Sequence, residues 1–145
     1  MGVLIFLGII SLPWFRDGLP IPPERKVYIT QNTPINATEY LVDREMPENL
    51  FNDMGFGSYL IWAAYPGNKV FVDPRIELYP QDVWTDYHMI SNGIPGWEQR
   101  LDKYDVQTLM LSTNFQARLI ESLKESNLWS IVYEDNVAVI YVRKG

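Results

Sequence analysis

Residues 50–73 read LFNDMGFGSYLIWAAYPGNKVFVD, and this stretch carries the pattern that decides the fold. A short apolar run at residues 50–52 and a second one at residues 69–72 each end at an aspartate. The residues between them predict a helix over 58–64 that ends at a turn rich in proline and glycine. Two strands joined by a helix are typical of a parallel βαβ unit.

The C-terminal third of the chain predicts the other strands. Val106 to Leu111 is a buried-strand candidate, and two β-branched runs over 129–133 and 137–142 flank the turn-forming triplet Glu134-Asp-Asn136, which indicates a hairpin. Helical spacing of apolar residues predicts four more helices, near 34–41, 81–90, 97–104 and 115–123. We therefore expect an α/β fold with a small, mainly parallel sheet flanked by helices and closed by a C-terminal antiparallel β-hairpin.

The N-terminal segment, residues 1–17, is apolar and carries no charge from residue 2 to residue 12. It is too short to cross a bilayer, which needs roughly 20 apolar residues. Two interpretations remain open. The segment is the last half of a membrane helix, with Trp14 and Phe15 at the interfacial belt, or it is a buried strand over residues 3–10.

A proline-rich linker is predicted over residues 18–26, because prolines restrict their neighbours and remove backbone donors. A soluble α/β domain is then predicted over residues 27–145, opening with a strand at 27–30. Arg16, Arg25 and Lys26 would favour a cytoplasmic side under the positive-inside rule, against the extracytoplasmic placement argued below.

The composition bounds the possible functions. Charged residues make up 21% of the chain and hydrophobic residues 47%, which is typical of a globular protein. The net charge of -6 repels phosphate backbones and argues against nucleic acid as a partner. The chain has no cysteine, which excludes disulfides and thiolate chemistry. One histidine, His88, excludes a two-histidine metal site within the chain.

Polar side chains gather where the first two predicted strands end. Asn52, Asp53, Asp73 and Arg75 would lie close together at one edge of a parallel sheet, and we predict that they bind substrate. The two carboxylates could hold a divalent cation or act as acid and base. Alternatively, Asp53 caps the next helix and Asp73 pairs with Arg75. No catalytic residue, metal ligand or cofactor is assigned.

Several motifs resemble the soluble tail of membrane glycosyltransferases related to dolichyl-phosphate-mannose protein mannosyltransferases, which use polyprenyl-phosphate sugars. The similarity covers roughly residues 27–143. It is carried by Leu50-Phe-Asn-Asp53, Gly57-Ser-Tyr59-Leu60 with Trp62, and Lys69-Val-Phe-Val-Asp73 with Arg75. Residues 51–55 also sit where oligosaccharyltransferase catalytic subunits carry Trp-Trp-Asp-Tyr-Gly. Only Asp53 and Gly55 match that motif, so its role in acceptor recognition is not carried over.

The resemblance implies an accessory extracytoplasmic domain without the catalytic centre, since in these families the catalytic acid lies in a loop between membrane helices. Such a domain would cover the membrane-embedded site or help to hold an acceptor. No activity is expected for the chain alone, while the parent would be a glycosyltransferase. The implied partners are the membrane, through the N-terminal segment, the membrane-embedded part of the parent protein, and a glycan or acceptor.

Two other functions remain open from the residues. The chain could be a free-standing small metal-dependent enzyme using Asp53 and Asp73, or a membrane-anchored binding or scaffold module with an aromatic surface. Exposure of Trp62, Trp84 and Trp97 discriminates the last of these, because buried rings would indicate simple packing.

Overall fold

The computed structural model describes residues 30–44, 46–47 and 49–145. The chain divides into two compact units, Met1–Thr30 and Gln31–Gly145. The predicted N-terminal segment, the predicted linker and the predicted strand as far as residue 29 lie outside the described residues. The second unit contains all of the helices and strands given below.

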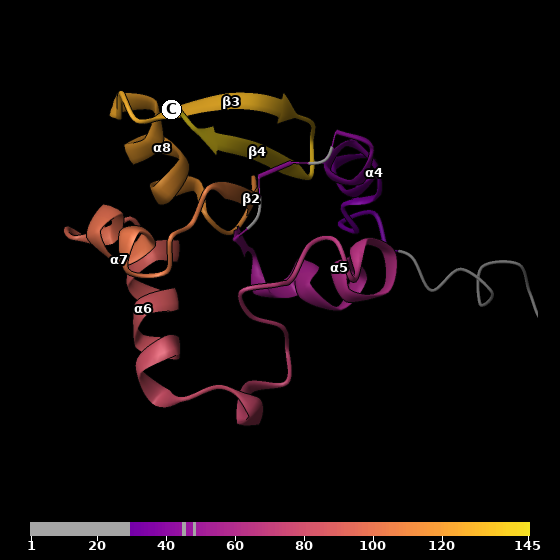
Figure 1. Cartoon of the computed structure of the whole chain (residues 1–145), viewed down its shortest axis with the longest axis horizontal. Coiled ribbons are helices and arrows are strands. Elements are labelled where there is room, and N and C mark those ends of the chain that lie inside the picture. Colours follow the sequence, from indigo (N-terminus) through magenta and orange to yellow (C-terminus); the bar gives the residue numbers. More distant parts are fainter. Residues whose placement is uncertain (1–29, 45, 48) are drawn as a thin grey trace, which may run out of the picture. The chain divides into compact units, whose positions relative to one another are not determined.

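A four-stranded sheet forms the centre of this second unit (Figure 1). Its strands are β1 (Leu50–Asn52), β2 (Thr108–Ser112), β3 (Trp129–Glu134) and β4 (Ala138–Arg143). They lie in the order β1-β2-β4-β3. Only β1 and β2 are parallel, whereas β4 runs antiparallel to both β2 and β3.

The expectation of a mainly parallel sheet is therefore wrong, while the α/β class and the C-terminal hairpin are confirmed. Residues 69–72 form no strand, so the predicted βαβ unit does not close there. The parallel partner of β1 is instead β2, which follows much later in the chain. The short turn between β3 and β4 permits only an antiparallel pair, because a parallel pair needs a crossover of a dozen or more residues.

Helices fill the connections, close to the positions that apolar spacing predicts. The described α-helices are α4 (Ile35–Asp43), α5 (Gly57–Ala64), α6 (Gln81–Ser91), α7 (Trp97–Lys103) and α8 (Ala117–Glu125). Two short 3-10 helices, η1 (Met54–Phe56) and η2 (Ile76–Leu78), stand before α5 and α6. Gly93 and Gly96 have φ of +59° and +92° between α6 and α7. This backbone conformation favours glycine and ends α6.

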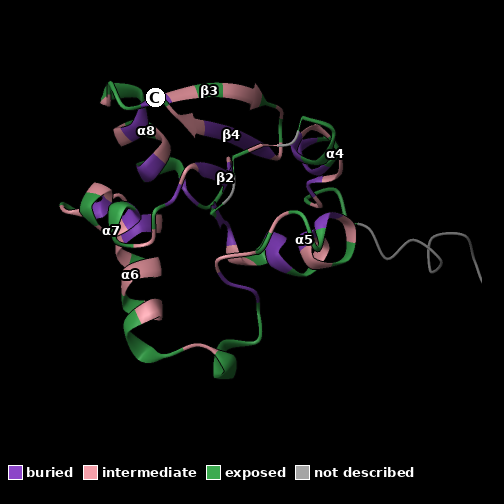
Figure 2. Ribbon diagram, in the orientation of Figure 1, coloured by how far each residue is buried: buried purple, intermediate pink, exposed green. Residues whose placement is uncertain are grey.

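Two hydrophobic cores lie on opposite faces of the sheet, because successive side chains of a strand point to opposite sides. On β2, Leu109 and Leu111 belong to one core and Met110 to the other. The first core is completed by residues of α6, α7 and α8, and the second by residues of α4 and α5. Figure 2 shows β2 and β4 as mostly buried between these helical layers.

The turn of the hairpin is held by its own aspartate. Asp135 Oδ1 accepts hydrogen bonds from the backbone N–H groups of Val137 and Ala138 at 2.7 and 2.8 Å. Tyr133 donates its hydroxyl proton to Asp135 Oδ2 at 2.6 Å.

Within the described part of the chain, no helix has both the length and the apolar character needed to cross a bilayer.

Candidate functional site

Asn52 ends β1 and is fully buried. Its side-chain amide bonds to the backbone of residues 71–72, in the loop after α5, in the way that a neighbouring strand would. Phe71 N–H donates to Asn52 Oδ1 at 2.8 Å, and Asn52 Nδ2 donates to Val72 O at 2.9 Å. Residues 71–72 therefore lie beside β1 without being a strand. The rings of Phe51 and Phe71 pack with their centroids 5.0 Å apart. Asn52 and the segment that leads to Asp73 thus lie side by side, although not as the ends of two parallel strands.

Asp53 serves as the cap of the helical segment that follows β1. Its Oδ1 accepts a hydrogen bond from Gly55 N–H at 2.8 Å. Burial raises the pKa of this carboxyl, although the backbone N–H groups of Gly55 and Phe56 act in the opposite direction. The capping role given to Asp53 as an alternative in the sequence analysis is thus confirmed.

Asp73 is held by three donor groups of Arg75 and by one hydroxyl. Its Oδ1 accepts from Arg75 N and Arg75 Nε, both at 2.9 Å, and its Oδ2 accepts from Arg75 Nη2 at 2.8 Å and Tyr79 Oη at 2.6 Å. The hydrogen bonds from Arg75 hold the pKa of Asp73 well below its usual range. Burial, with the bond to Asp73, raises the pKa of Tyr79 to about 12.

The start of α5 packs tightly against the segment that carries Asp73. A Cβ atom placed on Gly57 would lie 2.6 Å from Val72 O and 2.7 Å from Asp73 Cβ. Only glycine allows this approach of helix and loop. Asp53 and Asp73 thus both lie near the beginning of α5, one before it in sequence and one against its first residue.

The two aspartates are occupied by protein donors, and this limits the chemistry available to them. Among the described residues, no three His, Cys, Asp or Glu side chains come together to form a metal-binding group. Arg75 is different because 58% of its side chain is exposed while its partner Asp73 is 2% exposed. A guanidinium fixed in this way can bind an anionic or hydroxylated group from outside.

Two tyrosines of this region were not predicted to take part. Tyr79 lies six residues after Asp73, beyond η2, and completes the ligation of its carboxylate. Tyr87 on α6 accepts a hydrogen bond from Met54 N–H at 2.9 Å and stacks on Phe51 with centroids 5.6 Å apart. Asp73 and Tyr79 are only six residues apart, so their contact could have been found from the local sequence. The contact of Met54 with Tyr87 spans 33 residues, and no local sequence pattern predicts it.

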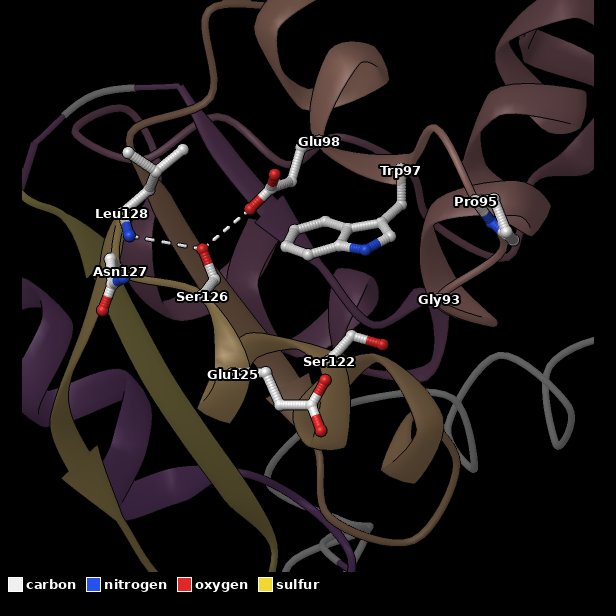
Figure 3. Close-up of a pocket in the computed structure, with 9 residues that line it drawn as sticks. All are labelled: Gly93, Pro95, Trp97, Glu98, Ser122, Glu125, Ser126, Asn127 and Leu128. Carbon is white, nitrogen blue, oxygen red and sulfur yellow. Dashed lines mark hydrogen bonds between the residues drawn. The ribbon is translucent and has the colours of Figure 1, made fainter.

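A hollow of about 500 Å³ lies on the other helical layer, where the α6–α7 connection meets the end of α8 (Figure 3). Ser126 Oγ donates to Glu98 Oε1 at 2.7 Å, and the Trp97 indole lies between Glu98 and Ser122. No basic side chain lines the hollow. Trp97 is only 9% exposed, so it packs into the core rather than offering a ring face to a ligand.

The fold has a counterpart among solved structures. It is similar to the C-terminal globular domain of an oligosaccharyltransferase from Archaeoglobus fulgidus, with a TM-score of 0.58 and 9% sequence identity. The similarity covers 81% of this chain and 100% of that domain. At this identity the likeness shows a shared fold. No protein-family model and no curated protein sequence matches the chain.

Proposed function

We propose that this chain is an accessory extracytoplasmic domain of a membrane glycosyltransferase-like protein that uses a polyprenyl-phosphate sugar. It carries no catalytic centre of its own. Its work is to cover the membrane-embedded site of the parent protein or to help hold the acceptor. Residues 1–17 attach it to the membrane as the end of a membrane helix.

The shared fold carries this proposal. The chain matches the whole length of a globular domain whose parent is an oligosaccharyltransferase. The resemblance of roughly residues 27–143 to the soluble tail of membrane glycosyltransferases points to the same class of parent. Because one fold can serve many functions, the proposal also needs a site, and the exposed Arg75 in the loop between α5 and η2 is our candidate for it.

Arg75 is the group that we propose contacts the acceptor or glycan, while Asn52, Asp53 and Asp73, which we predicted to bind substrate with it, are buried and support it from below. Asn52 holds the loop to the sheet, and Asp73 orients the guanidinium through its Nε and Nη2 atoms. Asp53 fixes the start of η1 beside them. This assignment favours binding and positioning over acid or base catalysis.

The extracytoplasmic placement is tested by chemical labelling. The chain has no cysteine, so Glu121→Cys on the exposed side of α8 would be a unique thiol. A membrane-impermeant maleimide added to intact cells should label it fully. Labelling that appears only after the cells are permeabilised would place the domain in the cytoplasm and overturn the proposal.

The role of Arg75 is tested by sugar transfer in membranes that contain the parent protein. Arg75→Gln should raise the acceptor KM about tenfold with little change in kcat, because one charge-assisted contact is lost. Arg118→Gln, at an exposed position of α8, is the matched control and should leave both constants unchanged. Equal KM values for Arg75→Gln and the unaltered protein would remove Arg75 from the acceptor site.

A further inference from the structure

The helix α5 has an unusual composition for a helix at a protein surface. Residues 54–68, which include all of α5, contain no charged side chain and no histidine. Leu60 and Ala64 face the core and are buried. The opposite side of the helix should then carry polar or charged residues, because surface helices of soluble proteins are amphipathic. It carries aromatic rings instead.

Trp62 is 78% exposed and Tyr65, directly after the helix, is 67% exposed. Tyr59 lies three residues before Trp62, on the same side of the helix, and the two rings pack with centroids 5.6 Å apart. An exposed tryptophan supported by a tyrosine is a large apolar area without a partner among the described residues. Figure 2 shows α5 with exposed as well as buried segments.

The same area continues into a hollow of about 560 Å³ between the end of α5 and the segment after α4. Among the residues that the structure describes, those that line it are uncharged: Val42, Met46, Pro47, Ala63, Ala64, Tyr65, Pro66, Gly67 and Asn68. We call Tyr59, Trp62, Tyr65 and Val42, together with this hollow, the aromatic surface. Val42 is itself 43% exposed.

We infer that the aromatic surface contacts the lipid headgroup region of a membrane, so that the folded unit lies on the bilayer in addition to being tethered to it. Trp and Tyr have an apolar body and a polar tip, which suits the boundary between headgroups and acyl chains. The chain as a whole has a net charge of -6, yet the described residues of its aromatic surface carry no charge. This is the charge pattern of a contact made by apolar burial and not by attraction to anionic lipid.

The length of the preceding chain agrees with such a contact. Residues 18–29 separate the apolar N-terminal segment from Thr30, and twelve extended residues reach on the order of 40 Å. A bilayer that held the N-terminal segment would therefore be within reach of the folded unit. The inference goes beyond the proposed function, because a lipid-contacting surface does not require a glycosyltransferase parent.

Site-specific fluorescence on the full chain tests the inference. Ser58→Cys places a unique thiol on the exposed side of α5, four residues before Trp62, and it can be labelled with the environment-sensitive dye NBD. Addition of phosphatidylcholine vesicles should shift its emission to the blue, and brominated lipid should quench it. The same dye at Glu121→Cys, on the opposite helical layer, should stay unchanged.

Substitution of Trp62 provides the matched comparison. In the Ser58→Cys background, Trp62→Ala should lower the ratio of lipid-contacting to free dye about tenfold, since one large aromatic anchor is lost. Phe115→Ala removes an aromatic side chain that is 77% exposed elsewhere in the chain and should have no effect. Salt at 1 M should not weaken the signal, and replacing part of the phosphatidylcholine by anionic lipid should reduce it.

Three results would overturn the inference. The dye at position 58 could remain in water when the vesicles bind, which would leave only the N-terminal segment in the membrane. Its signal could depend on anionic lipid and vanish in salt. It could also shift without vesicles as protein concentration rises, which would identify a second copy of the chain as the occupant. None of these would affect the labelling test of the proposed function.

Discussion

The two helical layers of the fold bury their inner sides alike but differ in what they turn outward. The layer of α6, α7 and α8 presents ion pairs. Asp86 on α6 accepts hydrogen bonds from Arg100, Lys103 and Tyr104, and Lys124 of α8 lies 3.7 Å from Glu121. On the other layer, α5 presents Trp62 and Tyr59 and has no charged residue at all.

The difference shows that the residues on the inner side of a helix are set by core packing, while those on its outer side are set by what the helix contacts there. A surface on which charged side chains pair with one another is suited to contact with water. An uncharged helix whose outer side carries aromatic rings is suited to a partner or to lipid. One small unit thus has one layer whose outer side carries ion pairs, and another layer in which the outer side of α5 carries exposed aromatic rings.

The first prediction tests whether the buried sides of α8 and α5 contribute equally to the stability of the fold. Leu119 on α8 and Leu60 on α5 are both fully buried. Leu119→Ala and Leu60→Ala should each lower the free energy of unfolding by about 3 kcal/mol, because each leaves a cavity in a packed core. Urea unfolding of the two variants measures this. A loss below about 1 kcal/mol for Leu60→Ala would mean that α5 is only loosely docked.

The second prediction concerns the loop that joins the two layers. Asp73→Asn should cost about 2 kcal/mol of unfolding free energy, since it removes a carboxylate that takes four hydrogen bonds. The loss is smaller than for a fully buried ion pair because Arg75 is largely exposed. Asp53→Asn is the control and should change stability by less than about 0.5 kcal/mol, because asparagine caps as well as aspartate.

The lowered pKa of Asp73 also predicts how the stability of the chain changes with pH. The pKa of Asp73 is lowered in the folded protein, so its contribution is fully present above the unfolded value of 3.8 and is lost as the pH falls through the folded value. The unaltered chain should therefore lose stability on acidification below about pH 4 more steeply than Asp73→Asn. Parallel acid unfolding curves for the two proteins would contradict the assignment.

A smaller effect is expected at the charged side of α6. Burial opposes ionisation of Asp86, but the hydrogen bonds from Lys103 and Tyr104 outweigh it and keep its pKa below the usual range. Asp86→Asn should cost about 1 kcal/mol, and 1 M salt should reduce this difference. Thermal unfolding with and without salt measures both. A salt-independent loss would show that packing, and not charge, stabilises this position.

The smallest effect on folding is expected at the aromatic surface. Trp62→Ala should change the free energy of unfolding by less than about 0.5 kcal/mol, because a ring that is 78% exposed contributes little to the core. Urea unfolding in the absence of lipid is the measurement. A loss of 2 kcal/mol or more would assign Trp62 to packing and weaken the contrast between the layers.

Local patterns predicted most of the elements. The hairpin was visible because two β-branched runs flank a turn whose Asp135 bonds to the backbone two and three residues later. The pairing of Asp73 with Arg75 was visible for the same reason, since the partners are two residues apart. Residues 69–72 look like a strand in sequence, and only the tertiary position of Asn52 shows that a side chain bonds to this segment instead.

The exposed aromatic rings could not be separated from core rings by composition. Trp62 and Trp97 are both tryptophans in helices, yet one is exposed and the other buried. Helical periodicity is weak on α5 because apolar residues lie on every side of the helix and only Ser58 is polar, so no charged face marks the side that faces outward. The absence of charge from residue 54 to residue 68 was the available signal.

Asn52 also bears on how this protein can be changed by evolution or by design. One amide that bonds to the backbone of both Phe71 and Val72 fixes the end of the loop, so residues 66–69 need not keep an alternating β pattern. That loop can accept insertions and new side chains while the sheet stays intact. A library that randomises residues 66–69 and keeps Asn52 would be a practical route to variants with altered binding.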